Sequence, residues 1–208
     1  MTVRIALLLS ALIAAPALSQ TAPASPPPAV AAKEDIVRVA LDTDKGRIVL
    51  ALDRGRAPVT VANFLRYVDA KRFDGISFFR AMPYGSGSGL IQAGITKDAR
   101  LLFPAIEHEP TSKTGLKHVE GAISMARTAP GTARSDFFIL AGAIPGFDAG
   151  SGQAGDDLGF AAFGRVVEGL DVVKAILAAP VDPNKGAGAM KGQILAQPVT
   201  IRTARKLD

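Results

Sequence analysis

The sequence predicts a mainly β domain: a closed antiparallel barrel with an α-helix over each end. Three features of the 208 residues predict it. Apolar and polar residues alternate near the start of the domain, two other stretches follow helical spacing, and short apolar runs between glycines and prolines fill most of the rest. The order of strands, helix, many strands, helix and strand fits a closed barrel better than a doubly wound α/β sheet.

The first expected element is a β-hairpin. Apolar residues occupy every second position from residue 37 to 41 and again from residue 48 to 52. Asp44, Lys45 and Gly46 lie between these stretches and supply turn residues. We therefore expect two paired strands with one buried face, made of Val37, Val39, Leu41, Ile48, Leu50 and Leu52.

Two segments carry the spacing of an α-helix. The first begins near Pro58, which suits a first helical turn, and runs for about three turns. The second is expected after Glu168 and stops before Pro180. The apolar face of the first consists of Val61, Phe64, Leu65 and Val68, and that of the second of Leu170, Val173 and Leu177.

The remaining strands are expected in short apolar runs bounded by turn residues. These runs are 76–82, 90–92, 122–126, 137–140 and 160–167, with a closing strand at 199–203. Many short strands of this kind are typical of an all-β barrel or sandwich.

The first residues have the composition of a signal peptide, which we assign to residues 1–19. Arg4 precedes an apolar run at 5–15, and small residues at 17 and 19 offer a cleavage site. An uncleaved membrane anchor is the alternative, but the run is shorter than the roughly 20 residues that span a bilayer. After cleavage we expect a protein without stable membrane insertion, in the periplasm or, as the alternative, secreted.

Residues 20–34 form a linker rich in proline and alanine, expected to be an extended tether. The folded domain is assigned to residues 35–208. The chain has no cysteine, which excludes disulfides and lipid attachment at a cysteine. The formal net charge is +5, and without Arg4 it is 5 − 1 = +4. Because the basic residues are scattered among acidic ones, we expect no nucleic-acid partner.

Six short segments occur in the order and spacing of the signature blocks of one enzyme family. They are 57–64 (APVTVANF), 78–80 (FFR), 90–94 (LIQAG), 121–127 (GAISMAR), 135–139 (SDFFI) and 163–166 (FGRV). On these segments the chain resembles the cyclophilins over residues 37–207. Residues 159–164 (GFAAFG) are especially similar to bacterial exported members.

The resemblance implies an eight-stranded barrel with two capping helices, and peptidyl-prolyl cis/trans isomerase activity without metal or cofactor. It implies, as partners, proline-containing segments of unfolded or exported proteins, and we expect a monomer. It also identifies Arg80 as the catalytic arginine. Rotation about an X-Pro bond breaks amide resonance against a barrier of about 18–20 kcal/mol. The twisted prolyl nitrogen regains a lone pair, and an arginine that is always charged suits it as a donor.

The resemblance also assigns the substrate groove. Gln92 holds the substrate backbone beside Arg80, and Phe138 forms the floor of the proline pocket. Alternation along 137–138 predicts that one phenylalanine points into the barrel and the other faces this pocket. The backbone of Arg127 is expected to pair with an extended peptide. The other substrate-binding positions are Leu90, Phe147, Ala126, Asp136 and Phe160.

Two departures from the family pattern bear on activity. The turn at 84–89 is longer than usual, and Gly89 stands where a phenylalanine is expected, so one pocket wall is lost unless Tyr84 folds back to replace it. Asp136 replaces a glutamine and places a carboxylate near Arg80, with which it could pair. These changes support an alternative function, a peptide-binding module with weakened catalysis.

A structural or hydrolytic barrel outside this family has little support. The only histidines are His108 and His118, in a polar region without cysteines, and we interpret both as surface residues. Neither a metal site nor a hydrolytic triad is therefore expected.

Overall fold

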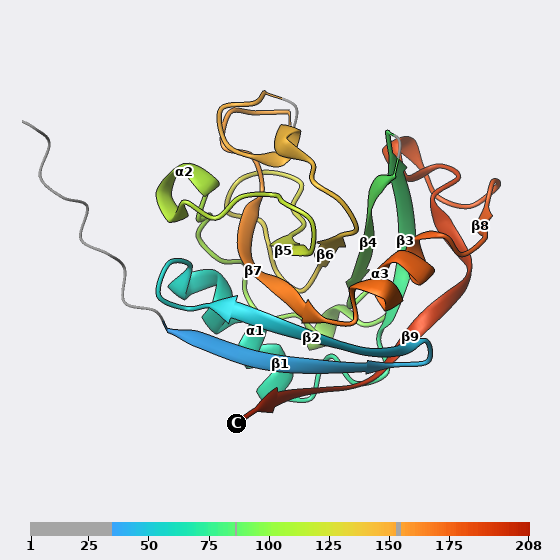
Figure 1. The fold of residues 1–208 in the computed structure, drawn as a ribbon, viewed down its shortest axis with the longest axis horizontal. Helices are drawn as coiled ribbons and strands as arrows, with labels where there is room; N and C mark the ends of the chain where they lie inside the picture. The colour runs from blue at the N-terminus through green and yellow to red at the C-terminus, as the bar shows by residue number, and fades with distance from the viewer. Residues whose placement is uncertain (1–34, 86, 153–154) are drawn as a thin grey trace, which may run out of the picture. The chain divides into compact units, whose positions relative to one another are not determined.

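The computed structural model describes residues 35–85, 87–152 and 155–208. The predicted signal peptide and linker, residues 1–34, lie outside this range. Figure 1 shows the strands wrapped into a barrel. Within the described ranges, no helix combines the length and the apolar character needed to cross a membrane.

Eight antiparallel strands form the closed barrel that the sequence predicts. Neighbouring strands around it are β1 (Ile36–Thr43), β2 (Gly46–Asp53), β7 (Ala161–Glu168), β5 (Ala122–Met125), β6 (Phe137–Leu140), β4 (Ser88–Gly94), β3 (Ser77–Tyr84) and β9 (Ile194–Leu207). The pairing of β1 with β9 closes it. A two-residue strand, β8 (Val181–Asp182), which the sequence pattern did not predict, extends the sheet beside β9.

The first hairpin has one face buried in the barrel and a tight turn at its end. Thr43 pairs with Gly46 across the turn, and Gly46 has a φ of 134°, a backbone conformation that favours glycine. The alternating residues from Val39 to Leu52 point into the barrel and are fully buried, as predicted. Their partners on the other face stay at least partly exposed over much of the hairpin, Arg38 among them.

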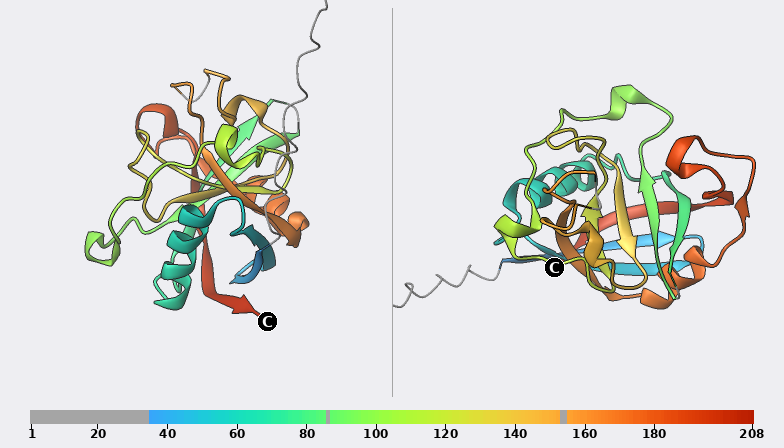
Figure 2. Two further views of the ribbon diagram at one scale, coloured as in Figure 1. Left: turned by 90° about the vertical axis from the view of Figure 1, so that its left-hand side faces the viewer. Right: turned by 90° about the horizontal axis from the view of Figure 1, so that it is seen from above.

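Both predicted helices are present, as α1 (Pro58–Asp69) and α3 (Leu170–Leu177). They lie apart on the barrel (Figure 2): α1 packs against β2, β7 and β9, and α3 against β2, β3 and β4. An unpredicted single turn, α2 (Thr111–Thr114), follows Glu109. The Glu109 carboxylate accepts from the backbone N–H groups of Val59 and Thr60, at 3.3 and 2.8 Å, and so caps α1 from 50 residues away.

Two separate apolar clusters divide the fold. The large one fills the barrel and centres on Phe64, whose ring centroid lies 5.2 Å from that of Phe137 and 5.5 Å from that of Phe163. The small one lies on the outer side of β4, β5 and β6 and includes Phe138. Phe137 thus faces the barrel interior and Phe138 the outside, which confirms the predicted alternation.

Candidate active site

A row of polar and aromatic residues crosses four neighbouring strands on the outside of the barrel. Arg80 of β3 pairs with Gln92 of β4, Gln92 with Phe138 of β6, and Phe138 with Ser124 of β5. Residues opposite one another in antiparallel strands project to the same face. The register therefore brings together Arg80, Gln92 and Phe138, which lie far apart in the sequence.

The Arg80 guanidinium is held by neutral acceptors. Its Nη1 donates to Gln92 Oε1 at 2.9 Å, while Nε and Nη2 both donate to Gln193 Oε1, at 2.9 and 2.6 Å. Nη2 also contacts Met82 Sδ at 3.3 Å. An arginine side chain has five N–H donors. These bonds leave one Nη1 hydrogen without a partner among the described residues.

Gln193 was not predicted as a site residue. β9 pairs with Phe78 of β3 at Val199 and with Arg80 at Ile194, so a large register shift leaves four β9 residues, 195–198, between the two pairings. As a result, the Gln193 carbonyl accepts from the Ala81 backbone N–H at 2.9 Å, and its side chain lies against Arg80. No local pattern could indicate this contact, since it joins residues 113 positions apart.

Asp136 does not pair directly with Arg80. Gln92 stands between them: its Oε1 accepts from Arg80, and its Nε2 donates to Asp136 Oδ2 across a long 3.5 Å. Ser135 Oγ donates to the other carboxylate oxygen at 3.0 Å. Burial raises the pKa of the Asp136 carboxyl, and these two hydrogen bonds oppose that shift. Burial lowers the pKa of the Arg80 guanidinium, and no carboxylate among the described residues pairs with it to oppose this shift.

An aromatic pocket adjoins this polar row. The Phe147 and Phe160 rings meet the Phe138 ring nearly at right angles, with centroids 5.6 and 5.4 Å away. Leu90 is buried in the same cluster, and Ala126 and Met82 pack against it. The structure therefore gathers the predicted apolar positions around Phe138, the residue that the sequence predicts as the pocket floor.

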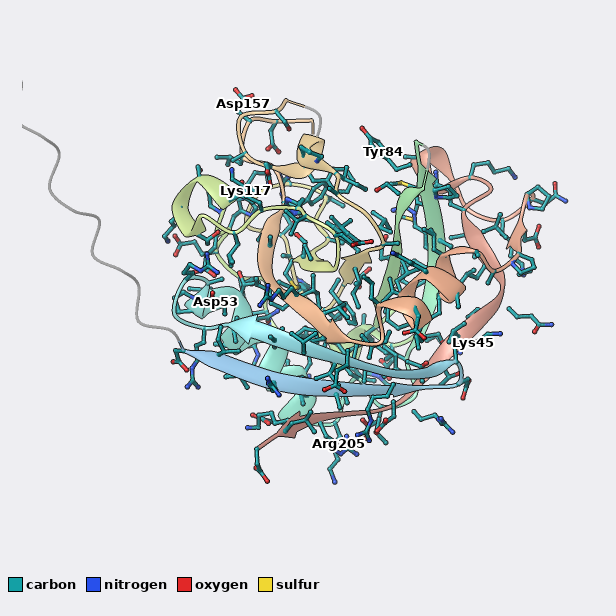
Figure 3. The ribbon with its side chains drawn as sticks, in the orientation of Figure 1. Lys45, Asp53, Tyr84, Lys117, Asp157 and Arg205 are labelled. Carbon is teal, nitrogen blue, oxygen red and sulfur yellow. The ribbon has the colours of Figure 1, made fainter. Side chains whose placement is uncertain are left out.

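The altered β3–β4 turn contributes one ring to this pocket. A Cβ atom on Gly89 would come within 2.6 Å of the Met82 carbonyl oxygen, so no phenylalanine fits there on this backbone. Tyr84, labelled near the tip of β3 in Figure 3, places its ring centroid 6.4 Å from that of Phe147. Tyr84 therefore approaches the edge of the pocket. It lies where a side chain that replaces the missing phenylalanine at Gly89 would have to lie.

The profile of the family described as cyclophilin type peptidyl-prolyl cis-trans isomerase/CLD matches residues 37–205. The chain belongs to this family. A peptidyl-prolyl cis-trans isomerase A from Dickeya dadantii is 37% identical over 141 residues, 66% of this chain and 70% of the relative. A peptidyl-prolyl cis-trans isomerase from Streptomyces antibioticus is 34% identical over 171 residues, 81% of this chain and 98% of the relative.

Solved cyclophilins share the fold. A cyclophilin type peptidyl-prolyl cis-trans isomerase from Cryptosporidium parvum superposes with a TM-score of 0.66 at 19% identity, covering 84% of this chain and 99% of the other. A second structure of that protein, determined in the presence of the dipeptide Ala-Pro, has a TM-score of 0.64. The eight-stranded barrel is therefore the cyclophilin fold, as the resemblance implied.

Arg127 of this cyclophilin has a different environment from Arg80. Its Nη2 donates to Asp156 Oδ1 at 2.8 Å and its Nε to the Gly159 carbonyl at 3.0 Å. The guanidinium lies 5.2 Å from the centroid of the Phe160 ring. The backbone of Arg127 has no hydrogen-bond partner among the described residues.

The interpretation of His118 as a surface residue was wrong, because only 1% of it is exposed. Its Nδ1 lies 2.8 Å from Asp148 Oδ1 and its Nε2 lies 2.9 Å from Ser124 Oγ. These contacts resemble a Ser-His-Asp triad, but Ser124 is fully buried and no substrate carbonyl could reach its Oγ. No local sequence pattern indicates this network, since it joins a loop, β5 and the turn after Phe147.

Proposed function

We propose that this cyclophilin catalyses cis/trans isomerisation of X-Pro bonds in exported or unfolded proteins. The observation that carries the proposal is a half-buried arginine, bound among the described residues only by neutral side chains, beside the cluster of aromatic rings around Phe138. One N–H group of this arginine remains available to donate a hydrogen bond to the substrate. The pocket offers apolar surface next to it.

The proposed mechanism needs no covalent intermediate. The proline ring packs on Phe138 between Phe147 and Phe160, and Gln92 fixes the guanidinium of Arg80 beside it. As the amide twists, its nitrogen becomes an acceptor for the remaining Arg80 N–H, an interaction that is stronger in the transition state than in the ground state. A charge-assisted hydrogen bond contributes about 1.5–3 kcal/mol. At about 1.36 kcal/mol per tenfold in rate, this supplies roughly one to two decades.

The rest of the substrate is proposed to lie extended along the groove. The backbone amide of Ala126 already donates to the Asp136 carbonyl at 2.9 Å, whereas the next residue, Arg127, keeps its backbone groups for a ligand. Main-chain pairing of this kind recognises a peptide without reading its side chains. It suits an enzyme that meets many unfolded chains.

Export is proposed on the sequence of residues 1–34. Removal of residues 1–19 would leave the barrel on a proline-rich tether in the periplasm, with full secretion as the alternative. N-terminal sequencing of the protein recovered from the periplasmic fraction tests this. We expect a new N-terminus near residue 20, and an intact Met1 in the membrane fraction would contradict it.

A protease-free exchange assay tests the activity. Exchange NMR on a short Ala-Pro peptide should show cis/trans interconversion faster with the protein than the uncatalysed tens to hundreds of seconds. The second candidate, a peptide-binding module, is favoured by the buried Asp136 carboxylate beside Gln92. Saturable peptide binding without accelerated exchange would establish that function instead.

A further inference from the structure

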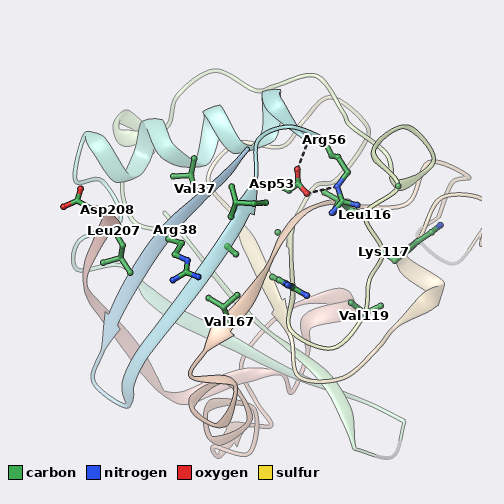
Figure 4. A pocket seen from close by; sticks show the side chains of 15 residues that line it. Val37, Arg38, Asp53, Arg56, Leu116, Lys117, Val119, Val167, Leu207 and Asp208 are labelled. Atoms are coloured by element: carbon green, nitrogen blue, oxygen red, sulfur yellow. Dashed lines mark hydrogen bonds and ion pairs between the residues drawn. The ribbon is translucent and has the colours of Figure 1, made fainter. Parts of the chain in front are cut away.

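A second groove lies away from the aromatic pocket. It encloses about 1080 Å³ between the outer face of β1, β2 and β7 and the loop at 115–119. Figure 4 shows Arg38 and Val167 on the strands and Lys117 and Val119 on the facing loop. None of the residues assigned to isomerisation lines this groove.

Two arginines whose side chains have no hydrogen-bond or ion-pair partner among the described residues face this groove. The register aligns Arg38 of β1 with Ala51 of β2, and Ala51 with Arg165 of β7, so a small residue separates two cations on one exposed face. Among the described arginines only these two and Arg134 have no side-chain hydrogen bond or ion pair. The groove also contains Asp53, which pairs with Arg56, and Asp208 at its rim.

Exposed aliphatic side chains surround the two arginines. Ile36, Val119, Val167 and Leu207 are each 37–52% exposed, and they make up half of the large apolar residues exposed on the described chain. Leu207 continues the row, since it pairs with Arg38. Scattered single apolar residues on a surface need no explanation, whereas a cluster in one groove marks an interaction site.

We propose that this groove binds an acidic, aliphatic peptide segment of another protein. Neighbouring strands lie about 4.8 Å apart, so the Cα atoms of Arg38 and Arg165 are separated by about 9.6 Å. A polyproline II segment repeats its faces every three residues and rises about 9.3 Å over that distance. Two glutamates three residues apart in such a segment would each reach one guanidinium, with an aliphatic residue over Ala51.

Peptide titration of the full chain tests this proposal. The probe is a fluorescent peptide without proline, Gly-Glu-Val-Ala-Glu-Val-Gly, which cannot occupy a proline pocket as substrate. We expect saturable binding by fluorescence anisotropy that weakens as salt is raised. The double substitution Arg38→Gln, Arg165→Gln should weaken binding at least about tenfold, the loss of a charge-assisted bond. Arg134→Gln, at an equally unpaired arginine outside the groove, should leave binding unchanged.

Three results would overturn the proposal. One is no saturable binding by the folded protein, and another is equal binding by the double variant and the wild type. The third is a different occupant: self-association that Arg38→Gln abolishes, or displacement of the probe by a peptide of residues 20–34. A peptide with lysine in place of both glutamates, and one with the glutamates two residues apart, control for charge and spacing.

A different observation carries a second inference, on the proposed peptide site itself. The His118 ring stacks on the Phe138 ring, with centroids 6.1 Å apart and planes 19° from parallel, and meets the Phe147 ring edge-on at 5.9 Å. Its hydrogen bond to Asp148 ties it to the residue after Phe147. Its contact with Ser124 ties it to β5, the strand that pairs with β6 at Phe138.

We infer that His118 is a positioning residue that holds the floor and wall of the proline pocket in place. This inference rests on the proposed function, so its test reads peptide affinity as well as turnover. His118→Leu should raise the Kd of a proline peptide by about three- to tenfold, the worth of one or two neutral hydrogen bonds, and raise KM with it. It should leave kcat within about threefold, because Arg80 is untouched.

Folding is checked by near-ultraviolet circular dichroism, and His118→Asn serves if the leucine variant fails to fold. An asparagine can still donate to Asp148, so it should restore part of the affinity. A folded His118→Leu protein with wild-type Kd and KM would overturn the positioning role. Absence of turnover in the wild type, with the affinity change still present, would instead contradict the proposed isomerase function.

Discussion

Arg80 and Arg127 occupy the same side of the barrel and have opposite surroundings. Among the residues that the structure describes, Arg80 bonds only to the neutral side chains of Gln92, Gln193 and Met82. The side chain of Arg127 is 3% exposed and is fixed by the Asp156 carboxylate and a backbone carbonyl. The Arg127 guanidinium in turn lowers the pKa of Asp156.

The difference separates an arginine that serves a ligand from one that serves the fold. A carboxylate partner neutralises a guanidinium and fixes its orientation, whereas neutral acceptors orient it and leave its charge available. We therefore assign reactivity to Arg80 and, to the Arg127 side chain, the fixing of residues 156–159 beside Phe160. Residue type and proximity to the pocket do not distinguish the two arginines; their partners do.

The largest expected effect is on turnover at Arg80. Arg80→Ala should lower kcat/KM by at least about tenfold, since it removes one charge-assisted bond to the twisted amide. Ground-state peptide affinity should fall much less. Arg80→Lys should restore only part of the rate, because an ammonium does not reproduce the planar fork. Exchange NMR on folded variants measures this, and undiminished turnover in Arg80→Ala would remove the distinction between the two arginines.

Arg127 should show the converse behaviour. Arg127→Ala removes the bond to the Gly159 carbonyl and the cation–π contact with Phe160, so Tm should fall by about 2–4 °C, which corresponds to about 1 kcal/mol. The value of kcat should stay within about threefold of the wild type. Calorimetry and exchange NMR on the same preparation check both. A tenfold loss of kcat with unchanged Tm would show that Arg127 acts on the substrate.

Gln193 sharpens the comparison, because it is the acceptor that most constrains Arg80. Gln193→Ala should lower kcat/KM by about two- to tenfold, the worth of a neutral hydrogen bond or two, without changing the Arg127 site. Gln193→Glu supplies the matched test, since it gives Arg80 the carboxylate partner that Arg127 has. It should reduce turnover further while raising Tm. Equal or faster turnover in Gln193→Glu would contradict the argument from neutral partners.

The sequence predicted elements whose pattern is local. The first hairpin and both longer helices follow from alternation and from helical spacing, because each element buries one face of its own. The closing strand was predicted at 199–203, but it spans Ile194–Leu207. Pro198 and the polar Gln197 interrupt its alternation, and the register shift beside β3 does the same.

The site was predicted where the family pattern supplied it and missed where long-range contacts decide it. Arg80, Gln92 and Phe138 come together by strand register, which no single segment encodes. Gln193 reaches Arg80 through a register shift, and His118 is buried although polar and exposed residues flank it. The proposed direct contact of Asp136 with Arg80 failed because the Gln92 side chain lies between them.

The smallest expected effect concerns Asp136, the nearest carboxylate that could make Arg80 resemble Arg127. Burial raises its pKa in the folded protein above the ordinary aspartate value of 3.8, so folding favours the protonated form. The wild type therefore loses stability as pH rises from 3.8 through the folded pKa, and the full penalty remains above that pKa. Asp136→Asn cannot ionise. Its Tm relative to the wild type should increase with pH across this window and become constant above it.

Turnover should change little in the same variants. Asp136 contacts Gln92 at 3.5 Å, too long for a strong hydrogen bond, so Asp136→Asn and Asp136→Gln should raise kcat/KM by less than about threefold. The glutamine variant restores the usual family residue and the asparagine variant preserves the volume of the side chain. Calorimetry between pH 3 and 8, roughly the range that brackets carboxyl titration, gives the stability difference. The contrary result is a Tm difference between Asp136→Asn and the wild type that shrinks as pH rises. It would mean that the fold stabilises the ionised Asp136 carboxylate, as Arg127 stabilises that of Asp156. The surroundings of Arg80 and Arg127 would then be more alike than their hydrogen-bond partners indicate.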